Sequence, residues 1–347
     1  MRPAWVLGAT GRTGRAIAGR LAAAGVPVVL VGRDGERLRR AAEHVANDPA
    51  IVVAADIDAA VRRLAREAPG VVVNTVGPFT ETAVPVARGC PPGTHYVDLS
   101  NELPAISDVL ALDADQQTLV AGAGFGVLAT ESVVLRLCAG EPAPDRVRVD
   151  ALAVVRNEAG VIGEALAASV VGALAGGGRR YEQGRLVKVR LGGDVERFAL
   201  PDGTEVVTGG GPSGELEAAH RASGAPFVVA ASAHVPTGRA MRAALPVIAT
   251  LVSVPALQRF AVRRVAAVRT TASEPKRPHS WARARVEWGD GRQRTGWLRA
   301  GEGMDFTVAA AAEVAARLAR GEGRPGAYTP GALFGPDLAE AAGGAFQ

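Results

Sequence analysis

The chain has little cysteine, little lysine and few aromatic residues. Its 347 residues include two cysteines, Cys90 and Cys138, whose number and separation exclude a disulfide framework and a cysteine-based zinc site. Two thiols without a framework are typical of a reducing compartment, so we expect a cytoplasmic protein. The five histidines lack metal-ligand spacing, and no metal site is predicted. With aromatic residues at 4%, the core is expected to be aliphatic.

Blocks of like charge and long apolar runs are also missing. The formal net charge of +4 is carried by arginine without a basic stripe, so nucleic-acid binding is not expected. The first residues enter a predicted strand directly, which leaves no room for a signal peptide. The most apolar window, residues 243–257, contains two prolines and is shorter than the roughly 20 residues that span a bilayer. We interpret it as a buried or dimer-forming helix, with contact to a membrane surface as the alternative.

What the chain does contain near its start is a glycine motif, GATGRTG at residues 8–14, directly after an apolar run and before a helical pattern. This strand–turn–helix layout brings a backbone close to a pyrophosphate and directs helix N–H groups at it. Gly8 permits the tight turn, Gly11 leaves room for phosphate, and Gly14 lets the helix lie against the strand. The same motif adds three residues to the predicted cofactor-binding set: Thr10, Arg12 and Thr13.

The second predicted strand ends at Arg33, where an NAD-binding domain usually carries an acidic residue for the ribose hydroxyls. An arginine can bind a 2′-phosphate instead, through a charge-assisted hydrogen bond worth roughly 1.5–3 kcal/mol. Arg33 therefore predicts NADP(H) over NAD(H), and the alternative is a solvated charge at a strand end. Asp34 is predicted to cap the following helix. Asp56 is placed either to meet the adenine amino group or to cap the next helix.

The fourth predicted strand runs into a glycine–proline turn. In doubly wound sheets the cofactor lies across the carboxyl ends of the strands. We therefore expect this turn to line the nicotinamide ribose and the floor of the cleft. Its predicted cofactor-binding residues are Asn74, Val76, Gly77 and Pro78.

Candidate catalytic residues follow the fifth predicted strand. Tyr96 and Asp98 share one face of that strand by its period of two, and Glu102 lies beyond its carboxyl end. Each has a structural alternative: Tyr96 as a core residue, Asp98 as the residue that holds the next loop, and Glu102 as a helix-start carboxylate favoured by the helix dipole. His234, at the end of a later strand, is the fourth catalytic candidate. Two further residues are candidates for binding a substrate carboxylate or thioester: Arg156 and Asn157.

The tyrosine–lysine pair of short-chain dehydrogenases is missing, because no tyrosine of this chain has a lysine four residues later. This disfavours alcohol–ketone chemistry. Hydride transfer to an iminium or a conjugated C=C bond needs less assistance, because the electrophile is already activated. An S-x-x-K pattern at residues 273–276 contains Pro275, which prevents the helical turn that would place lysine beside serine.

With these residues assembled, the chain resembles the saccharopine dehydrogenase-like oxidoreductases, which include saccharopine reductases and trans-acting enoyl reductases. The matching segments are residues 8–14, 31–33, 73–79, 93–100, 122–126, 326–330 and 333–335. The resemblance implies an NADP-binding domain, a central substrate and dimerisation domain, and a C-terminal segment that returns to the first domain. It does not imply a substrate, because members reduce C=N or C=C bonds. Many members read Gly-Phe-Asp where this chain has Gly126 after Phe125.

We therefore predict an α/β fold, with a Rossmann-type doubly wound parallel sheet and a second α+β domain with a mixed sheet. The predicted domains are an NADP-binding Rossmann domain (1–140), a substrate and dimerisation domain (141–303) and a C-terminal segment (304–347) that packs back on the first. The predicted function is an NADPH-dependent reductase of a C=C or C=N bond in a small-molecule or acyl substrate. The alternatives are a saccharopine-type amine-forming or amine-cleaving dehydrogenase and a non-catalytic NADP-sensing protein. A homodimer without a transmembrane segment is expected.

Overall fold

The computed structural model describes the chain except residues 157–159, 162–163 and 272–276. It forms two compact units. Unit 1 comprises Met1–Leu128 and Met304–Gly343, and unit 2 comprises Ala129–Gly303 and Gly344–Gln347. The first boundary lies within helix α6 (Phe125–Cys138), upstream of the boundary expected after residue 140.

Unit 1 is built on a parallel sheet in the order β17-β6-β5-β4-β1-β2-β3. The strand order reverses beside β1, which is the arrangement of a doubly wound sheet. Apolar runs such as VVLVG in β2 form central strands because helices cover both faces of the sheet. The strands are β1 (Ala4–Leu7), β2 (Val28–Gly32), β3 (Ala50–Val53), β4 (Val71–Asn74), β5 (His95–Asp98), β6 (Thr118–Val120) and β17 (Gly326–Tyr328).

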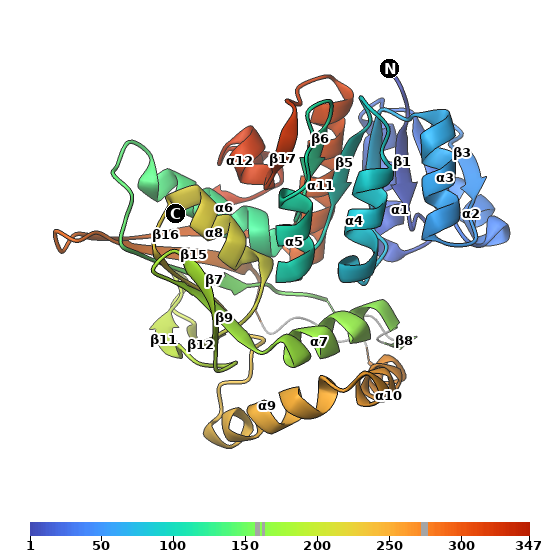
Figure 1. Ribbon diagram of the computed structural model, residues 1–347. Coiled ribbons are helices and arrows are strands. Elements are labelled where there is room, and N and C mark those ends of the chain that lie inside the picture. Colours follow the sequence, from blue (N-terminus) through green and yellow to red (C-terminus); the bar gives the residue numbers. More distant parts are fainter. Residues whose placement is uncertain (157–159, 162–163, 272–276) are drawn as a thin grey trace. The chain divides into compact units, whose positions relative to one another are not determined.

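The helices of unit 1 alternate with these strands. Helices α3, α4 and α5 lie side by side in front of the sheet in Figure 1. The helices are α1 (Arg12–Ala23), α2 (Gly35–Ala42), α3 (Ile57–Glu67), α4 (Phe79–Gly89), α5 (Leu103–Leu110), the start of α6, α11 (Gly303–Ala319), α12 (Pro330–Phe334) and α13 (Leu338–Ala341). The predicted Rossmann-type fold is confirmed.

Two predicted helix boundaries in this unit are wrong. The pattern of residues 103–117 predicts one helix from the sequence, but α5 ends at Leu110, and the carbonyls of Ala114 and Gln117 accept hydrogen bonds from Gly326 N–H at 2.9 and 3.0 Å. The sequence also predicts a helix that Thr130 caps, but α6 begins at Phe125, whose N–H donates to Thr307 Oγ1 at 3.1 Å. In both cases the partner is distant in sequence, so local patterns could not show it.

Unit 2 contains a mixed sheet in the order β10-β9-β13-β7-β15-β16-β18, with the β11–β12 ribbon attached through β13. β13 and β7 are parallel, and the other pairs are antiparallel. The predicted mixed sheet is confirmed, although β9 was not predicted. The strands are β7 (Arg146–Leu152), β9 (Gly178–Glu182), β10 (Arg185–Val189), β11 (Glu196–Ala199), β12 (Glu205–Gly210), β13 (Phe227–Ser232), β15 (Ser280–Glu287), β16 (Gln293–Ala300) and β18 (Ala345–Phe346); a separate pair is β8 (Gly160–Val161) with β14 (Arg269–Thr270).

The two faces of this sheet differ in chemistry, because strand residues alternate between them. Val149, Ala284 and Val286 lie on one face and are buried. Arg148, Asp150 and the arginines of β15 lie on the other. Helix α8 (Gly214–Ser223) packs on β7 and β13.

Three further helices of unit 2 pack against one another: α7 (Glu164–Gly176), α9 (Arg239–Val252) and α10 (Pro255–Ala266). The apolar window 243–257 is helical, with a break at Ser253 and Val254. Its interpretation as a buried segment is wrong, since Val247, Leu251 and Leu257 are exposed. Among the described residues no single helix is long and apolar enough to span a membrane. Only α9 and α10 together reach that length and composition, and they are bent by 115°.

Candidate functional site

The glycine motif forms the turn between β1 and α1. Gly8 has φ +80°, a backbone conformation that favours glycine, and its N–H donates to Val31 O at 3.0 Å. A Cβ on Gly14 would lie 2.5 Å from Gly8 O, and a Cβ on Gly8 would lie 2.7 Å from Thr75 Oγ1. The motif therefore brings the first helix into direct contact with the first strand and with the turn after β4.

Substituting Gly14 is expected to disturb this contact. In Gly14→Ala the new methyl group meets a backbone carbonyl, and such overpacking costs about 1–3 kcal/mol of unfolding free energy. Because the turn must shift, NADPH binding should weaken as well. Gly19→Ala in the same helix is the control: nothing lies within 4 Å of its new Cβ, so it should stabilise the helix by up to about 1 kcal/mol. Thermal unfolding and NADPH titration check both variants, and equal effects would contradict the role of Gly14.

The amino end of α1 is open, unlike the amino ends of the next two helices. Its N-cap is Gly11, and none of the described side chains caps it. Asp34 caps α2 by accepting from the N–H groups of Glu36 and Arg37, and Asp56 caps α3 by accepting from Ala59 N–H at 2.7 Å. The first N–H groups of a helix carry partial positive charge, so α1 offers donors to an anion.

The same caps test two predictions. The cap predicted for Asp34 is confirmed, and its pKa is lowered, first by the hydrogen bond from Arg37 N–H. Of the two alternatives for Asp56, the structure shows the helix cap, while its contact to adenine stays a prediction.

Arg33 follows β2 and is exposed beside Asp34. Among the described residues it has no hydrogen bond or ion pair. Arg40 in the following helix, by contrast, pairs with Glu36 at 2.6 Å. The guanidinium of Arg33 is therefore available to a ligand phosphate.

The turn after β4 is tied to the glycine motif. Thr75 Oγ1 donates to Leu7 O at 2.7 Å, and the buried Asn74 accepts from Val76 N–H at 3.1 Å. Asn74 Nδ2 also donates to Thr82 Oγ1 at 3.2 Å, and Thr82 Oγ1 donates to Val76 O. Asn74 thus positions the turn that contains Val76, Gly77 and Pro78. The contribution of Thr75 and Thr82 was missed from the sequence because hydroxyl contacts leave no periodic signal.

Tyr96 and Asp98 form a fully buried pair at the end of β5. Tyr96 Oη donates to Asp98 Oδ2 at 2.9 Å. Asp98 Oδ1 accepts from Ser100 N–H, Ser100 Oγ and Gly122 N–H at 2.9, 2.6 and 2.9 Å. Burial raises the pKa of both groups, while these hydrogen bonds act to lower that of Asp98. These contacts agree with the structural roles given above as alternatives to catalysis. Tyr96 lies in the core, and Asp98 holds the loop after β5 and joins it to the end of β6.

The other candidates lie elsewhere. Glu102 is the N-cap residue of α5, and its Oε2 accepts from Asn101 N–H at 3.1 Å, which places it at the helix start, as its structural alternative expects. His234 belongs to unit 2, follows β13 and is exposed, with Nδ1 3.3 Å from Ser232 Oγ. Desolvation lowers the pKa of His234, and the charge of Arg277 adds to this. Arg156 N–H donates to Glu302 Oε1 at 2.8 Å. Asn157 and the S-x-x-K pattern lie outside the described residues.

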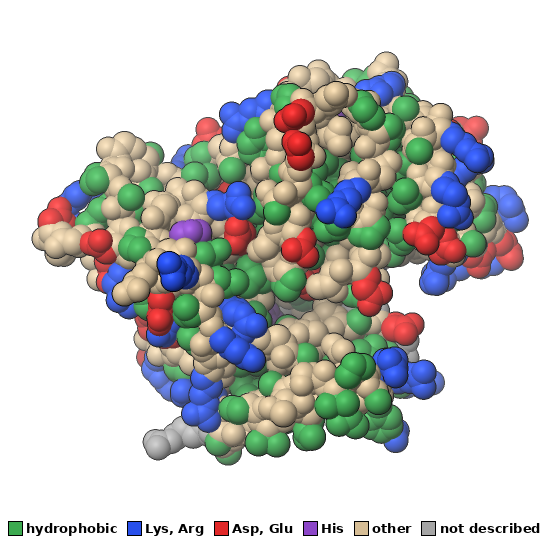
Figure 2. Space-filling model, in the orientation of Figure 1, with side chains coloured by type: hydrophobic (Ala, Val, Ile, Leu, Met, Phe, Trp, Pro, Cys, Tyr) green, Lys and Arg blue, Asp and Glu red, His purple; other side chains and the backbone are tan. Residues whose placement is uncertain are grey.

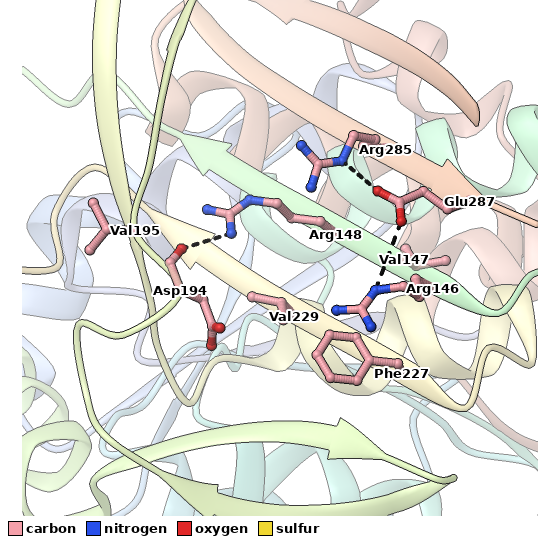
Figure 3. Close-up of a pocket in the computed structure, with 9 residues that line it drawn as sticks. All are labelled: Arg146, Val147, Arg148, Asp194, Val195, Phe227, Val229, Arg285 and Glu287. Carbon is pink, nitrogen blue, oxygen red and sulfur yellow. Dashed lines mark hydrogen bonds and ion pairs between the residues drawn. The ribbon is translucent and has the colours of Figure 1, made fainter. Parts of the chain in front are cut away.

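A pocket of about 190 Å³ opens on the polar face of the unit 2 sheet (Figure 3). Figure 3 shows arginine and glutamate side chains from β7 and β15 linked by ion pairs over Phe227. Arg148 pairs with the fully buried Asp150 at 3.0 Å and donates to Asp194 O at 2.8 Å. The sequence signal, which we missed, is alternate arginines in β7 and β15. Because carboxylates neutralise most of these cations, the cluster is foremost a structural network.

Residues 4–122 match the family model of the saccharopine dehydrogenase NADP binding domain. The chain is similar to a solved structure of apo histidine-tagged saccharopine dehydrogenase (L-Glu forming) from Saccharomyces cerevisiae. The identity is 13% and the TM-score 0.61, with 99% of this chain and 96% of that chain covered. A solved short-chain dehydrogenase from Sphingobium yanoikuyae in complex with NADPH is similar over a part of the chain, with 18% identity, a TM-score of 0.30 and coverage of 35% of this chain and 71% of that chain. No curated protein matches in sequence.

The parallel sheet and its glycine turn define a Rossmann-type nucleotide-binding protein. The family model is more specific: residues 4–122 match the saccharopine dehydrogenase NADP binding domain. The family resemblance found in the sequence is confirmed. The likeness to the yeast structure shows the fold over nearly the whole chain.

Proposed function

We propose that the protein is an NADPH-dependent reductase that transfers hydride to a C=C or C=N bond of a small-molecule or acyl substrate. The observation that supports this most directly is the open amino end of α1 in a domain of the NADP-binding family, with the available Arg33 at the end of β2. The Gly8–Gly14 contact supports it further, because a side chain there would fill the space the turn requires.

Each part of the dinucleotide has a candidate partner in unit 1. The N–H groups at the start of α1 and the side chain of Thr13 would bind the pyrophosphate. Arg33, with Arg12 in the glycine motif, would hold the 2′-phosphate by charge-assisted hydrogen bonds. The turn held by Asn74 would lie along the nicotinamide ribose.

The protein residues favour an activated electrophile. Bound NADPH would supply the hydride. Tyr96 is an unsuitable general acid, because its hydroxyl is fully buried and donates to Asp98. We propose that Asp98 and Tyr96 are positioning residues, and that Glu102 and His234 are the remaining candidates to deliver a proton. A C=C or C=N bond conjugated to a carbonyl or protonated at nitrogen needs only such limited assistance.

A saccharopine-type amine-forming or amine-cleaving dehydrogenase is the second candidate. It is favoured by the likeness in fold to the yeast saccharopine dehydrogenase, which is described as L-Glu forming. Both candidates use the same cofactor site and differ in the bond that is reduced.

The test is NADPH oxidation, followed by absorbance, against a panel of imines and enoyl thioesters. Turnover of enoyl thioesters supports reduction of C=C bonds, and turnover of imines formed from amino acids supports the saccharopine-type alternative. Glu102→Gln and His234→Gln, each measured with the best substrate, identify the proton donor by a fall in kcat with little change in NADPH affinity. Tight NADPH binding without turnover of any substrate would contradict a reductase and favour the NADP-sensing alternative.

A further inference from the structure

Helices α9 and α10 of unit 2 expose an unusual amount of apolar surface. Seven of the thirteen large apolar side chains that the described residues expose fall within residues 241–268. The most exposed are Val247 at 63% and Phe260 at 57%. The seven are Met241, Val247, Leu251, Val254, Leu257, Phe260 and Val268. Figure 2 shows hydrophobic side chains gathered over α9 and α10, in the lower part of the view.

These side chains recur at helical spacing. Val247, Leu251 and Val254 follow one another at intervals of four and three residues, which places them on one face of α9 and its end. Leu257 and Phe260 continue the interval of three into α10. The inner side of this pair packs on α7, so the apolar face lies on the outer side. We call the exposed residues of α9 and α10 the α9–α10 surface.

The charge of the α9–α10 surface has one sign. Between Glu217 and Glu274 the sequence contains no aspartate or glutamate. Helix α10 carries three exposed arginines, Arg259, Arg263 and Arg264, and the guanidinium of Arg264 lies 5.2 Å from the centre of the Phe260 ring. Such a surface cannot neutralise its own arginines by ion pairs.

We propose that the α9–α10 surface docks on an anionic lipid bilayer. Helices with an apolar face and flanking arginines bind at the interface of a bilayer, where the apolar side chains enter the acyl boundary and the cations meet lipid phosphates. A second copy of the chain fits less well, because a two-fold interface would bring this acid-free surface against itself. Spanning is disfavoured, because α9 and α10 are bent by 115° and the 14 residues of α9 reach only about 21 Å of the roughly 30 Å core.

Co-sedimentation of the full chain with vesicles tests the proposal. We expect binding to phosphatidylcholine vesicles that contain phosphatidylglycerol, weak binding to pure phosphatidylcholine, and loss of binding at high salt. Replacing Arg259, Arg263 and Arg264 by glutamine should weaken binding by about fivefold per arginine. Leu251→Ser with Phe260→Ser should weaken it by at least about tenfold.

The matched controls lie on β10, away from this surface in sequence. Leu186→Ser removes a side chain that is 43% exposed, and Arg185→Gln removes an exposed charge; neither should change vesicle binding. All substituted side chains are exposed, so the variants should keep the thermal unfolding of the wild type.

Two results would overturn the proposal. One is the absence of binding to anionic vesicles, or equal binding by the wild type and the α9–α10 variants. The other is a lipid-free dimer in analytical ultracentrifugation that Leu251→Ser with Phe260→Ser converts to monomer, which would assign the surface to a second copy. NADPH oxidation in solution does not depend on this surface, so the outcome is independent of the proposed function.

Discussion

Arg33→Asp is expected to weaken NADPH binding by about 10- to 150-fold and to leave NADH binding nearly unchanged. The guanidinium of Arg33 has no hydrogen bond or ion pair within the described part of the chain and lies at the end of β2, where the adenosine end of the dinucleotide is expected. An aspartate there removes the charge-assisted hydrogen bond to the 2′-phosphate and adds repulsion. It also provides the carboxylate that ribose hydroxyls prefer. Fluorescence titration with both nucleotides measures the change.

Arg20→Asp is the matched control for this experiment. Arg20 lies in the last turn of α1, so the substitution makes the same change in net charge in the same unit, at the opposite end of the helix from the glycine motif. Arg20→Asp should leave the affinity for NADPH and the affinity for NADH both unchanged. Equal losses for both nucleotides in Arg33→Asp would contradict the assignment of Arg33 to the 2′-phosphate.

Asp98→Ala is expected to lower the unfolding free energy of unit 1 by at least about 3 kcal/mol, at about 1–3 kcal/mol for each buried group left without a partner. Four donors lose their acceptor: Tyr96 Oη, Ser100 N–H, Ser100 Oγ and Gly122 N–H. Asp98→Asn keeps an oxygen for Ser100 and Gly122 and deprives only the Tyr96 hydroxyl, so it should cost about 1 kcal/mol. Chemical denaturation measures both variants.

The dependence of the unfolding free energy on pH in the acid range distinguishes a structural role of Asp98 from a catalytic one. Burial raises the pKa of Asp98 above its usual 3.8, so the folded chain holds the proton more tightly than the unfolded chain. Protonation of Asp98 therefore stabilises the folded chain. This contribution is fully present below pH 3.8, the pKa in the unfolded chain, and is lost as the pH rises through the higher pKa of the folded chain. Asp98→Asn should lack this dependence. A stable Asp98→Asn protein with unchanged NADPH affinity and a kcat reduced by orders of magnitude would instead make Asp98 catalytic.

Much of unit 1 could be predicted because its signals are local. The apolar run of β2, the glycine motif and the caps at Asp34 and Asp56 each depend on neighbouring residues. The start of α6 and the strand β17 could not be predicted, because they depend on Thr307 and on β6, which lie far away in sequence.

The candidate site divides in the same way. The turn residues and Arg33 lie where the strand–turn–helix pattern placed them. The pattern also placed Tyr96 and Asp98 on one strand face, but it could not show that Gly122 and Ser100 satisfy the Asp98 carboxylate. In unit 2 the ion pair of Arg283 with Asp150 depends on β15 and β7 becoming neighbours in the sheet. Sequence spacing does not determine that.

The most direct measurement is a calorimetric titration of the wild-type protein with NADP⁺ and with NAD⁺. We expect one NADP⁺ to bind per chain, at least about tenfold more tightly than NAD⁺, as a single charge-assisted contact to the 2′-phosphate requires. Absence of heat with both nucleotides, or an affinity for NAD⁺ equal to that for NADP⁺, would contradict it.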